Sequence, residues 1–187
     1  MKTYQQIQEG VYDPNIFKAI FLAGGPGSGK SYVVRRTTGG LGMKIVNSDD
    51  IYEKMLNDAG LDTTPEDIFS DQGQEIRGKA KAVTKRMQGN FLEGRLGLII
   101  DGTGKDYDKI SKQTAGLKAL GYECYMIFVN TSLDTAQERN KKRKRTLAPK
   151  AVEAMWNEVQ NNIGKFQRLF GGKNFIIVDN NDAGEDV

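Results

Sequence analysis

The fold of this chain is decided by residues 20–31, which read IFLAGGPGSGKS. The stretch from Gly24 to Ser31 matches the pattern G-x-x-x-x-G-K-[ST] at every fixed position, directly after an apolar run. Glycines let consecutive backbone N–H groups turn towards one anion, and the amino end of a following helix adds its positive dipole end. The sequence therefore predicts a strand, a phosphate-binding loop and a helix, in that order.

The polar residues of this loop have distinct expected roles. Lys30 should reach the β- and γ-phosphates of a nucleotide, and the Ser31 hydroxyl should ligate Mg²⁺. We therefore expect ATP and Mg²⁺ as cofactors. The residues predicted to bind the nucleotide are Gly25, Gly27, Ser28, Gly29, Lys30 and Ser31.

Five short runs are apolar along their whole length, and we expect them to be strands. Such runs are typical of a parallel sheet that is covered on both faces. Helical patterns lie between them, which favours a three-layer α/β/α domain with right-handed crossovers. No repeat or linker interrupts the chain, so we expect one domain over residues 1–187. The predicted strands are Lys18–Ala23, Met43–Asn47, Leu96–Asp101, Glu123–Val129 and Phe175–Asp179.

Apolar residues at three- and four-residue spacing predict the helices. One helix should begin near Gly29, and a second should follow Ser48 and Asp49. Thr64 and Pro65 are typical of a helix start. Further helices are expected through the stripe Ile76, Ala80, Val83, Met87 and Phe91, over about Tyr107–Leu120, from near Ser132, and from Pro149 along the stripe Val152, Met155, Trp156, Val159, Ile163, Phe166 and Phe170.

Composition excludes several kinds of protein. The 187 residues include no histidine, which excludes Ser-His and Cys-His nucleophiles and histidine metal sites. Cys124 is the single cysteine, so no disulfide can form within the chain. No apolar run approaches the ~20 residues that a membrane span needs, and the first ten residues do not resemble a signal peptide. We expect a cytoplasmic protein without a membrane partner, and a monomer by default.

Carboxylates follow two of the predicted strands, and ligands of parallel sheets bind beyond the carboxyl ends of the strands. Asp101 ends the third strand and should face the water shell of Mg²⁺. Asp49, with Asp50 as the alternative, follows the second strand and could accept the proton of an acceptor hydroxyl. Each of these residues could instead serve only to stabilise the start of a helix.

A basic segment covers residues 139–150, with seven Lys and Arg residues and no acidic residue. The net charge of the whole chain is only +3, so the remainder is net acidic. The segment lies where nucleoside-phosphate kinases have a mobile lid. Arg139 and Arg143 are four residues apart and would share one face of a helical lid, where they could stabilise charge in a transition state. A solvated face or a nucleic-acid patch would have the same composition.

Four motifs together resemble the kinase domain of phage polynucleotide 5′-hydroxyl kinases and the zeta-toxin-type kinases, which phosphorylate a sugar nucleotide. The motifs are Gly24–Ser31, Asn47–Asp50, Asp101–Thr103, and Arg139–Arg143 with Pro149, and the similarity extends over about Lys18 to Val178. It implies a P-loop kinase fold and a phage or bacterial source.

The resemblance also implies roles for individual residues. By it, Asp49 is the general base, Arg143 and Arg139 are lid arginines, and Asp101 is the acidic residue that ends the third strand. Ser48 is a departure, because the polynucleotide kinases have arginine at this position. It weakens the case for a nucleic-acid end and leaves nucleotide, nucleoside and sugar-nucleotide acceptors open.

Three functions therefore compete. The first is an ATP- and Mg²⁺-dependent kinase acting on a hydroxyl, best on the 5′-hydroxyl of a nucleic acid or nucleotide-like molecule, with a sugar nucleotide as the alternative acceptor. The second is a nucleoside monophosphate kinase, which needs no general base because its acceptor is already anionic. The third is a nucleotide-dependent switch without an acceptor. For the kinases, the expected partners are a nucleotide donor and a small-molecule or nucleic-acid-end acceptor.

Overall fold

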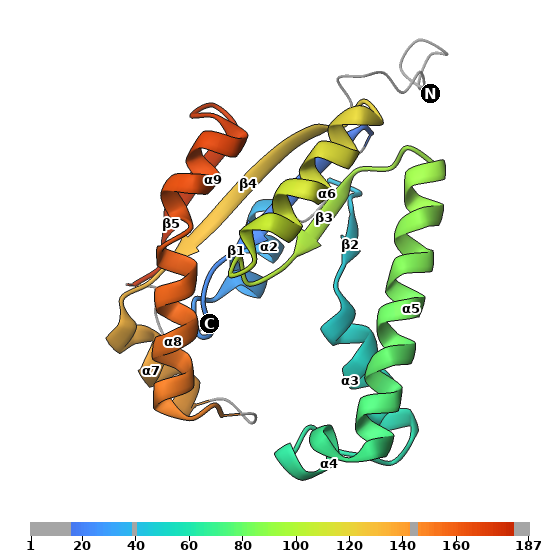
Figure 1. Ribbon diagram of the computed structural model, residues 1–187, viewed down its shortest axis with the longest axis vertical. Helices are drawn as coiled ribbons and strands as arrows, with labels where there is room; N and C mark the ends of the chain where they lie inside the picture. The colour runs from blue at the N-terminus through green and yellow to red at the C-terminus, as the bar shows by residue number, and fades with distance from the viewer. Residues whose placement is uncertain (1–15, 39–40, 143–145, 182–187) are drawn as a thin grey trace, which may run out of the picture.

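A computed structural model describes residues 16–38, 41–142 and 146–181 of the chain. In these residues the strands form one parallel sheet in the order β2-β3-β1-β4-β5 (Figure 1). The predicted sheet is confirmed, and the ends of β2, β3 and β4 differ from the predicted bounds by one or two residues. The strands are β1 (Lys18–Ala23), β2 (Lys44–Val46), β3 (Leu98–Asp101), β4 (Glu123–Asn130) and β5 (Phe175–Asp179).

Most of the described helices begin at a polar side chain that accepts a hydrogen bond from a first-turn backbone N–H. Asn47, Thr64, Ser70, Asp106 and Ser132 do so, as N-cap chemistry predicts. The helices are α2 (Lys30–Thr38), α3 (Ser48–Asp58), α4 (Pro65–Phe69), α5 (Asp71–Glu93), α6 (Tyr107–Ala119), α7 (Leu133–Lys141), α8 (Pro149–Gln160) and α9 (Ile163–Phe170).

Helices cover both faces of the sheet, which confirms the three layers. Alternate residues of β1 point to opposite faces, as the strand period requires. Phe21 packs in one cluster with Leu117 of α6 and Phe170 of α9. Leu22 packs in another cluster with Val34 of α2. Figure 1 shows α6 and α9 on the near face of the sheet.

The predicted single helix from Pro149 to Phe170 is wrong, because the chain breaks between α8 and α9. The side chain of Asn162 is buried at the break and donates to the carbonyls of Gly104 (3.0 Å) and Lys105 (2.8 Å). The apolar stripe nevertheless continues across the break, since Val159 and Phe166 are both buried. Hydrophobic spacing alone therefore could not reveal the interruption.

The helices α3, α4 and α5 pack together beside the edge strand β2, around a separate buried cluster that includes Tyr52, Leu56 and Ile76 (Figure 1). The predicted stripe on α5 is interrupted, because Val83 is 42% and Met87 is 38% exposed, whereas Ile76 and Ala80 are buried and Phe91 packs against the core of the sheet. The far edge strand is also less covered than predicted, with Ile176 and Ile177 about half exposed. Among the described residues, no helix combines the length and apolar character that a membrane crossing requires.

Candidate functional site

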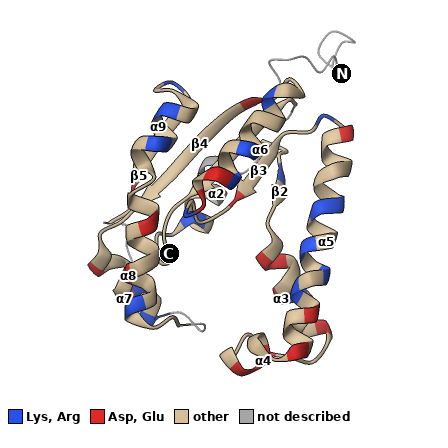
Figure 2. Ribbon diagram, in the orientation of Figure 1, with Lys and Arg blue, Asp and Glu red and all other residues tan. Residues whose placement is uncertain are grey.

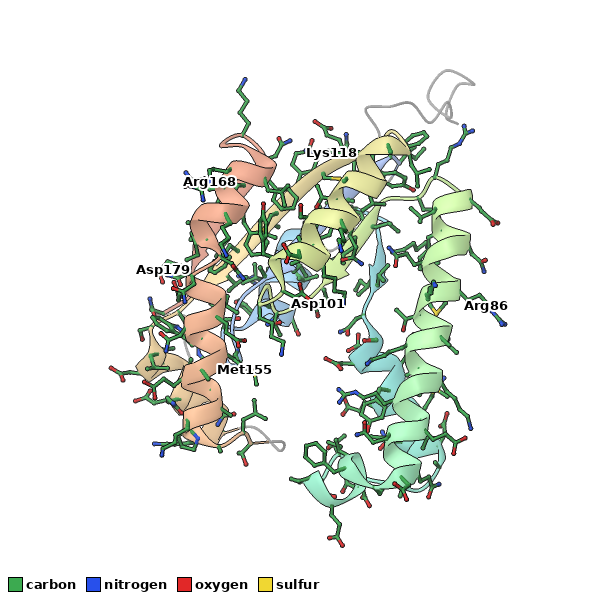
Figure 3. All side chains as sticks on the ribbon, viewed as in Figure 1. Arg86, Asp101, Lys118, Met155, Arg168 and Asp179 are labelled. Carbon is green, nitrogen blue, oxygen red and sulfur yellow. The ribbon has the colours of Figure 1, made fainter. Side chains whose placement is uncertain are left out.

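The predicted site residues come together beyond the carboxyl ends of the parallel strands. The loop after β1 leads into α2, and Asp101 is the last residue of β3. Figure 3 shows Asp101 at the end of β3 that faces α3 and α8, whereas Lys118 and Arg168 lie towards the opposite end of the sheet. This is the edge at which parallel α/β sheets bind their ligands.

The loop from Gly24 to Ser31 is held from two sides. Gly24 N–H donates to the Thr103 carbonyl (3.0 Å), which ties the loop to the residues after β3. Gly27 has a φ of +77°, and a Cβ there would lie 2.6 Å from the Ala136 carbonyl oxygen of α7. Only glycine has both the left-handed backbone and the close approach that this position requires. Glycine at position 27, a variable position of the motif, thus follows from the packing of α7 against the loop.

The polar side chains of the loop fit a polyphosphate. Lys30 Nζ donates to the carbonyls of Gly24 (2.7 Å) and Gly25 (3.4 Å), so the ammonium group lies directly at the loop. Ser28 is 1% exposed, and its Oγ has no hydrogen-bond partner among the described residues. A buried hydroxyl without a partner is costly, and a bound anion would satisfy it. Ser31, the predicted metal ligand, is exposed at the start of α2.

Asn47 joins two carboxylates at the site. Its Nδ2 donates to Asp101 Oδ2 (3.1 Å) and to Asp50 Oδ1 (3.0 Å), while its Oδ1 accepts from Asp49 N–H (2.8 Å). One side chain therefore caps α3 and connects it to the end of β3. The sequence motif included Asn47, but no role was predicted for it; its position before a helix was the signal that could have identified it as the cap.

The two carboxylates that Asn47 joins are electrostatically strained. Burial raises the pKa of Asp101, and so do the charges of Asp50 and Asp49, whereas the Lys30 ammonium lowers it. Burial also raises the pKa of Asp50, with a further contribution from Asp49. Asp101 Oδ1 is buried and lacks a partner within the described residues. A cation beside Asp101 would relieve this strain.

The arrangement fits Mg²⁺ held mainly by a nucleotide. No group of three or more His, Cys, Asp or Glu residues that could hold a metal by itself occurs in the described part of the chain. Mg²⁺ in nucleotide sites usually takes one or two protein ligands, with phosphates and water completing its shell. Ser31 and Asp101 were predicted as these ligands, and that role stays a prediction.

The geometry distinguishes Asp49 from Asp50. Asp50 is bound by Asn47, whereas the side chain of Asp49 is 72% exposed and lies 3.6 Å from Arg77 Nη2. The Arg77 guanidinium lies over the ring of Tyr52, 5.0 Å from its centroid. Arg77 belongs to α5, and no motif marked it. These contacts leave Asp49 accessible to an incoming hydroxyl.

The basic segment begins at the phosphate-binding loop. Arg139 Nη1 donates to the Gly27 carbonyl (3.4 Å). Within the predicted lid over 139–150, α7 ends at Lys141 and α8 begins at Pro149, while Arg143 lies outside the described residues. That the segment acts as a lid stays a prediction. Figure 2 shows basic residues where α7 ends and α8 begins, opposite acidic residues of α3 and α4. Arg139 thus reaches the loop, while the role of Arg143 stays a prediction.

Trp156, which belongs to the apolar stripe of the helix predicted from Pro149, lies beside the loop. The side chain is half-buried, and its Nε1 donates to the Thr131 carbonyl (2.9 Å). A Cβ on Gly25 would lie 3.7 Å from the Trp156 Cα, so α8 contacts the loop here. The chain has one tryptophan, which makes its fluorescence a reporter of this region.

Comparison with solved structures supports the fold. The chain is 16% identical to a chain of the AvrRxo1-ORF1:-ORF2 complex with ATP, with a TM-score of 0.69 over 90% of this chain and 56% of that one. It is 18% identical to a chain of the Pnkp1/Rnl/Hen1 RNA repair complex, with a TM-score of 0.62 over 81% and 46%. It is 17% identical to a chain of the PezAT toxin-antitoxin system of Streptococcus pneumoniae, with a TM-score of 0.59 over 94% and 70%.

These similarities show a P-loop kinase-like fold, and the chain spans about half the length of the first two of these structures. A comparison with curated proteins finds no match. A family model described as an AAA domain matches residues 20–166, which include the phosphate-binding loop, Asp49, Asp101 and Arg139. Because the match covers well over half of the sequence, the chain belongs to this AAA domain family.

Proposed function

We propose that this protein is a kinase that transfers the γ-phosphate of Mg²⁺-ATP to a hydroxyl group. The observation that carries the proposal is the Asn47 bridge, which holds the start of α3 against Asp101 at the phosphate-binding loop. This bridge supports the proposal that the exposed carboxylate of Asp49 serves the acceptor side of the site. A protein that only binds a nucleotide has no need for a general base at this position.

On the donor side, the loop N–H groups and Lys30 bind the phosphates and stabilise the charge that develops on them. Mg²⁺, when bound, neutralises charge on the β- and γ-phosphates. Asp101 and Ser31 would hold this ion, and Asp101 Oδ1 is oriented without a competing partner among the described residues. Arg139, already at the Gly27 carbonyl, lies close enough to the loop to add positive charge there.

On the acceptor side, Asp49 accepts the proton as the hydroxyl oxygen forms its bond to the γ-phosphorus, while the bond from that phosphorus to the departing ADP breaks. The ion pair with Arg77 holds the carboxylate at the start of α3. We propose the 5′-hydroxyl of a nucleic acid or nucleotide-like molecule as the acceptor, with a sugar nucleotide as the alternative. We also propose that the protein acts as a monomer in the cytoplasm.

Two of the similar structures support this class of acceptor without deciding within it. One relative belongs to an RNA repair complex and another to a toxin-antitoxin system. A nucleoside monophosphate kinase remains the main competitor. Its acceptor phosphate is already anionic, so its turnover would not depend on Asp49.

A transfer assay tests the proposal. Purified protein, Mg²⁺ and γ-labelled ATP are offered 5′-hydroxyl oligonucleotides, nucleosides, nucleoside monophosphates and UDP-sugars in parallel. We expect label on one hydroxyl acceptor, lost in Asp49→Asn and in Lys30→Ala and kept in Asp58→Asn, which changes an exposed carboxylate at the far end of α3. Label on a monophosphate that persists in Asp49→Asn would favour the competitor. Label found only as free phosphate would favour a nucleotide-dependent switch.

A further inference from the structure

The turn that follows β5 contacts the backbone of the phosphate-binding loop. Asn180 in this turn is 6% exposed, and its Nδ2 donates to the Ser28 carbonyl at 2.8 Å. The two residues are 152 positions apart in the sequence, so only the fold brings them together. Buried amide side chains with a single defined partner are costly to misplace, which makes this contact specific.

The turn itself is fixed by further hydrogen bonds. Asn180 N–H donates to the Asn130 carbonyl (2.9 Å), and Ser132 N–H donates to Asn181 Oδ1 (2.7 Å). Asn181 in turn donates through its backbone and side chain to Asp179 Oδ1 (3.1 and 2.6 Å). The amide of Asn180 therefore approaches the loop from a defined direction, set by the end of β4 and the start of α7.

The planarity of the peptide unit gives this contact a consequence for the phosphate site. In a trans peptide the C=O of one residue and the N–H of the next point in opposite directions. The described residues contain no cis peptide. A hydrogen bond that holds the Ser28 carbonyl away from the site therefore aims the Gly29 N–H into it. Gly29 has a φ of +80°, the conformation in which successive N–H groups of such a loop converge on an anion.

The preceding carbonyl of the loop, that of Gly27, also accepts a hydrogen bond from outside the loop, in this case from α7. Arg139 Nη1 donates to the Gly27 carbonyl (3.4 Å), and α7 approaches Gly27 too closely for any side chain. Two consecutive carbonyls of the loop are thus held from outside. The Asn180 contact is the shorter and the more buried of the two.

We propose that Asn180 is a positioning residue of the phosphate-binding loop: by holding the Ser28 carbonyl, it orients the Gly29 N–H towards the polyphosphate of the nucleotide. The inference rests on the proposed function only in taking the loop to bind polyphosphate. By this proposal, the turn after β5 contributes to binding of the phosphates. A turn that only contacted the nucleoside would have no effect on a ligand without a base.

The test compares two ligands in wild type and variants. Binding of ATP and of inorganic tripolyphosphate, each with Mg²⁺, is measured by calorimetry. Asn180→Asp keeps the shape of the side chain but replaces the donor with a carboxylate facing a carbonyl. We expect this variant to weaken the binding of ATP and of tripolyphosphate by the same factor. The factor should be about tenfold or more, because a hydrogen bond is lost and a carboxylate then faces a carbonyl oxygen. Asn180→Ser is neutral, but its side chain is too short to reach the Ser28 carbonyl, so it should also weaken the binding of both ligands. It replaces Asn180→Asp in the test if that variant does not fold.

Asn162→Asp is the matched control. Asn162 is 5% exposed and also donates its amide to backbone carbonyls, but those belong to Gly104 and Lys105. We expect this variant to lower the melting temperature of the ligand-free protein and to leave the affinity for tripolyphosphate within twofold. A loss of stability alone is thereby separated from a loss of positioning.

An NMR titration supplies a signature that a merely structural role would not move. The Gly29 amide proton should move downfield as ADP binds to wild type, and this movement should shrink in Asn180→Asp. Unchanged tripolyphosphate affinity in both Asn180 variants would overturn the inference, even if ATP binding fell. Wild type that binds neither ligand would overturn both the inference and the proposed function. A third outcome is that the Asn180 variants bind tripolyphosphate more weakly than wild type, but wild type transfers phosphate to no acceptor. This outcome would overturn the proposed function alone.

Discussion

Asn47 Nδ2 donates a hydrogen bond of 3.1 Å to Asp101 Oδ2. Asn47 directly follows β2, and Asp101 is the last residue of the neighbouring strand β3. The same asparagine caps α3 through Asp49 N–H. Beyond the pairing of β2 with β3, one side chain therefore links the candidate base to the candidate metal ligand. This link makes Asn47 a more informative position than either carboxylate alone.

Two variants of Asn47 separate its two roles. Asn47→Ser retains a side-chain cap but cannot bridge to Asp101, whereas Asn47→Ala loses both functions. We expect both variants to lower the rate of phosphate transfer by the same ~10–100-fold, the usual effect of losing an outer partner of a metal ligand. Only the alanine variant should lose a further ~1 kcal/mol of unfolding free energy in urea. Transfer at the wild-type rate in Asn47→Ser would show that the bridge does not position the site.

Asp101 should reduce the stability of the ligand-free protein at neutral pH. Its pKa is raised, mainly by burial, so between its ordinary and its folded value the native state binds more protons than the unfolded state. The contribution of Asp101 to stability is thus fully present at low pH and is lost as pH rises through the raised pKa. Asp101→Asn should increase the unfolding free energy at pH 7 and should abolish transfer.

Urea denaturation across pH checks the sign of this effect. The stability gain of Asp101→Asn should be largest at pH 7 and should shrink as pH falls through the pKa of Asp101 in the folded protein. Asp108→Asn, at the start of α6, is a suitable control because Asp108 is exposed and belongs to a helix terminus that favours negative charge. A destabilised Asp101→Asn variant at pH 7 would contradict the assignment of a strained carboxylate.

The fold could be predicted from the sequence because its signals are local. The apolar runs and the loop of Gly24–Ser31 each specify their own structure, and together they determine the parallel sheet. The break between α8 and α9 could not be predicted, because it is caused by contacts of Asn162 with Gly104 and Lys105, far away in the sequence. Exposure of Val83 and Met87 also depends on where α5 leaves the sheet, which periodicity does not encode.

The site was predictable only where a residue type is itself unusual. Lys30, Asp49 and Asp101 could be proposed because each belongs to a recognisable motif at the carboxyl end of a strand. Arg77 and Asn180 were not assigned roles, since an arginine within a helix and an asparagine after a strand are common in any sequence. Their importance arises from the residues that the fold places against them, Asp49 in one case and Ser28 in the other.

Two glycines of the loop should respond differently to the same substitution. Gly27→Ala forces a side chain into a left-handed conformation and places its Cβ 2.6 Å from the Ala136 carbonyl oxygen. We expect a loss of about 1–3 kcal/mol or more in unfolding free energy, the usual cost of such strain. A Cβ at Gly25 meets atoms only at 3.7 Å and beyond, so Gly25→Ala should change stability by less than about 1 kcal/mol.

Thermal and urea unfolding of the two glycine variants provides the comparison. Because the difference depends on α7 packing at Gly27, it should appear in the ligand-free protein. Trp156 fluorescence can follow the transition close to the loop, since its Nε1 bonds the Thr131 carbonyl and its backbone lies beside Gly25. Equal stability of the two variants would show that α7 does not pack as tightly on the loop as the structure has it.

Arg139 and Arg143 are the remaining basic residues with a predicted role, and Arg139 alone lies within the described residues. Arg139→Ala removes the guanidinium that donates to Gly27, and we expect turnover to fall by ~10²–10³-fold, as for the loss of one preorganised charge stabiliser. The same fall is expected for Arg143→Ala if both arginines act on the transferred phosphate. Arg168→Ala is the control, because Arg168 lies towards the opposite end of the sheet (Figure 3). A decrease below threefold in Arg139→Ala, measured as turnover at saturating ATP and acceptor, would assign Arg139 to the packing of α7 rather than to catalysis.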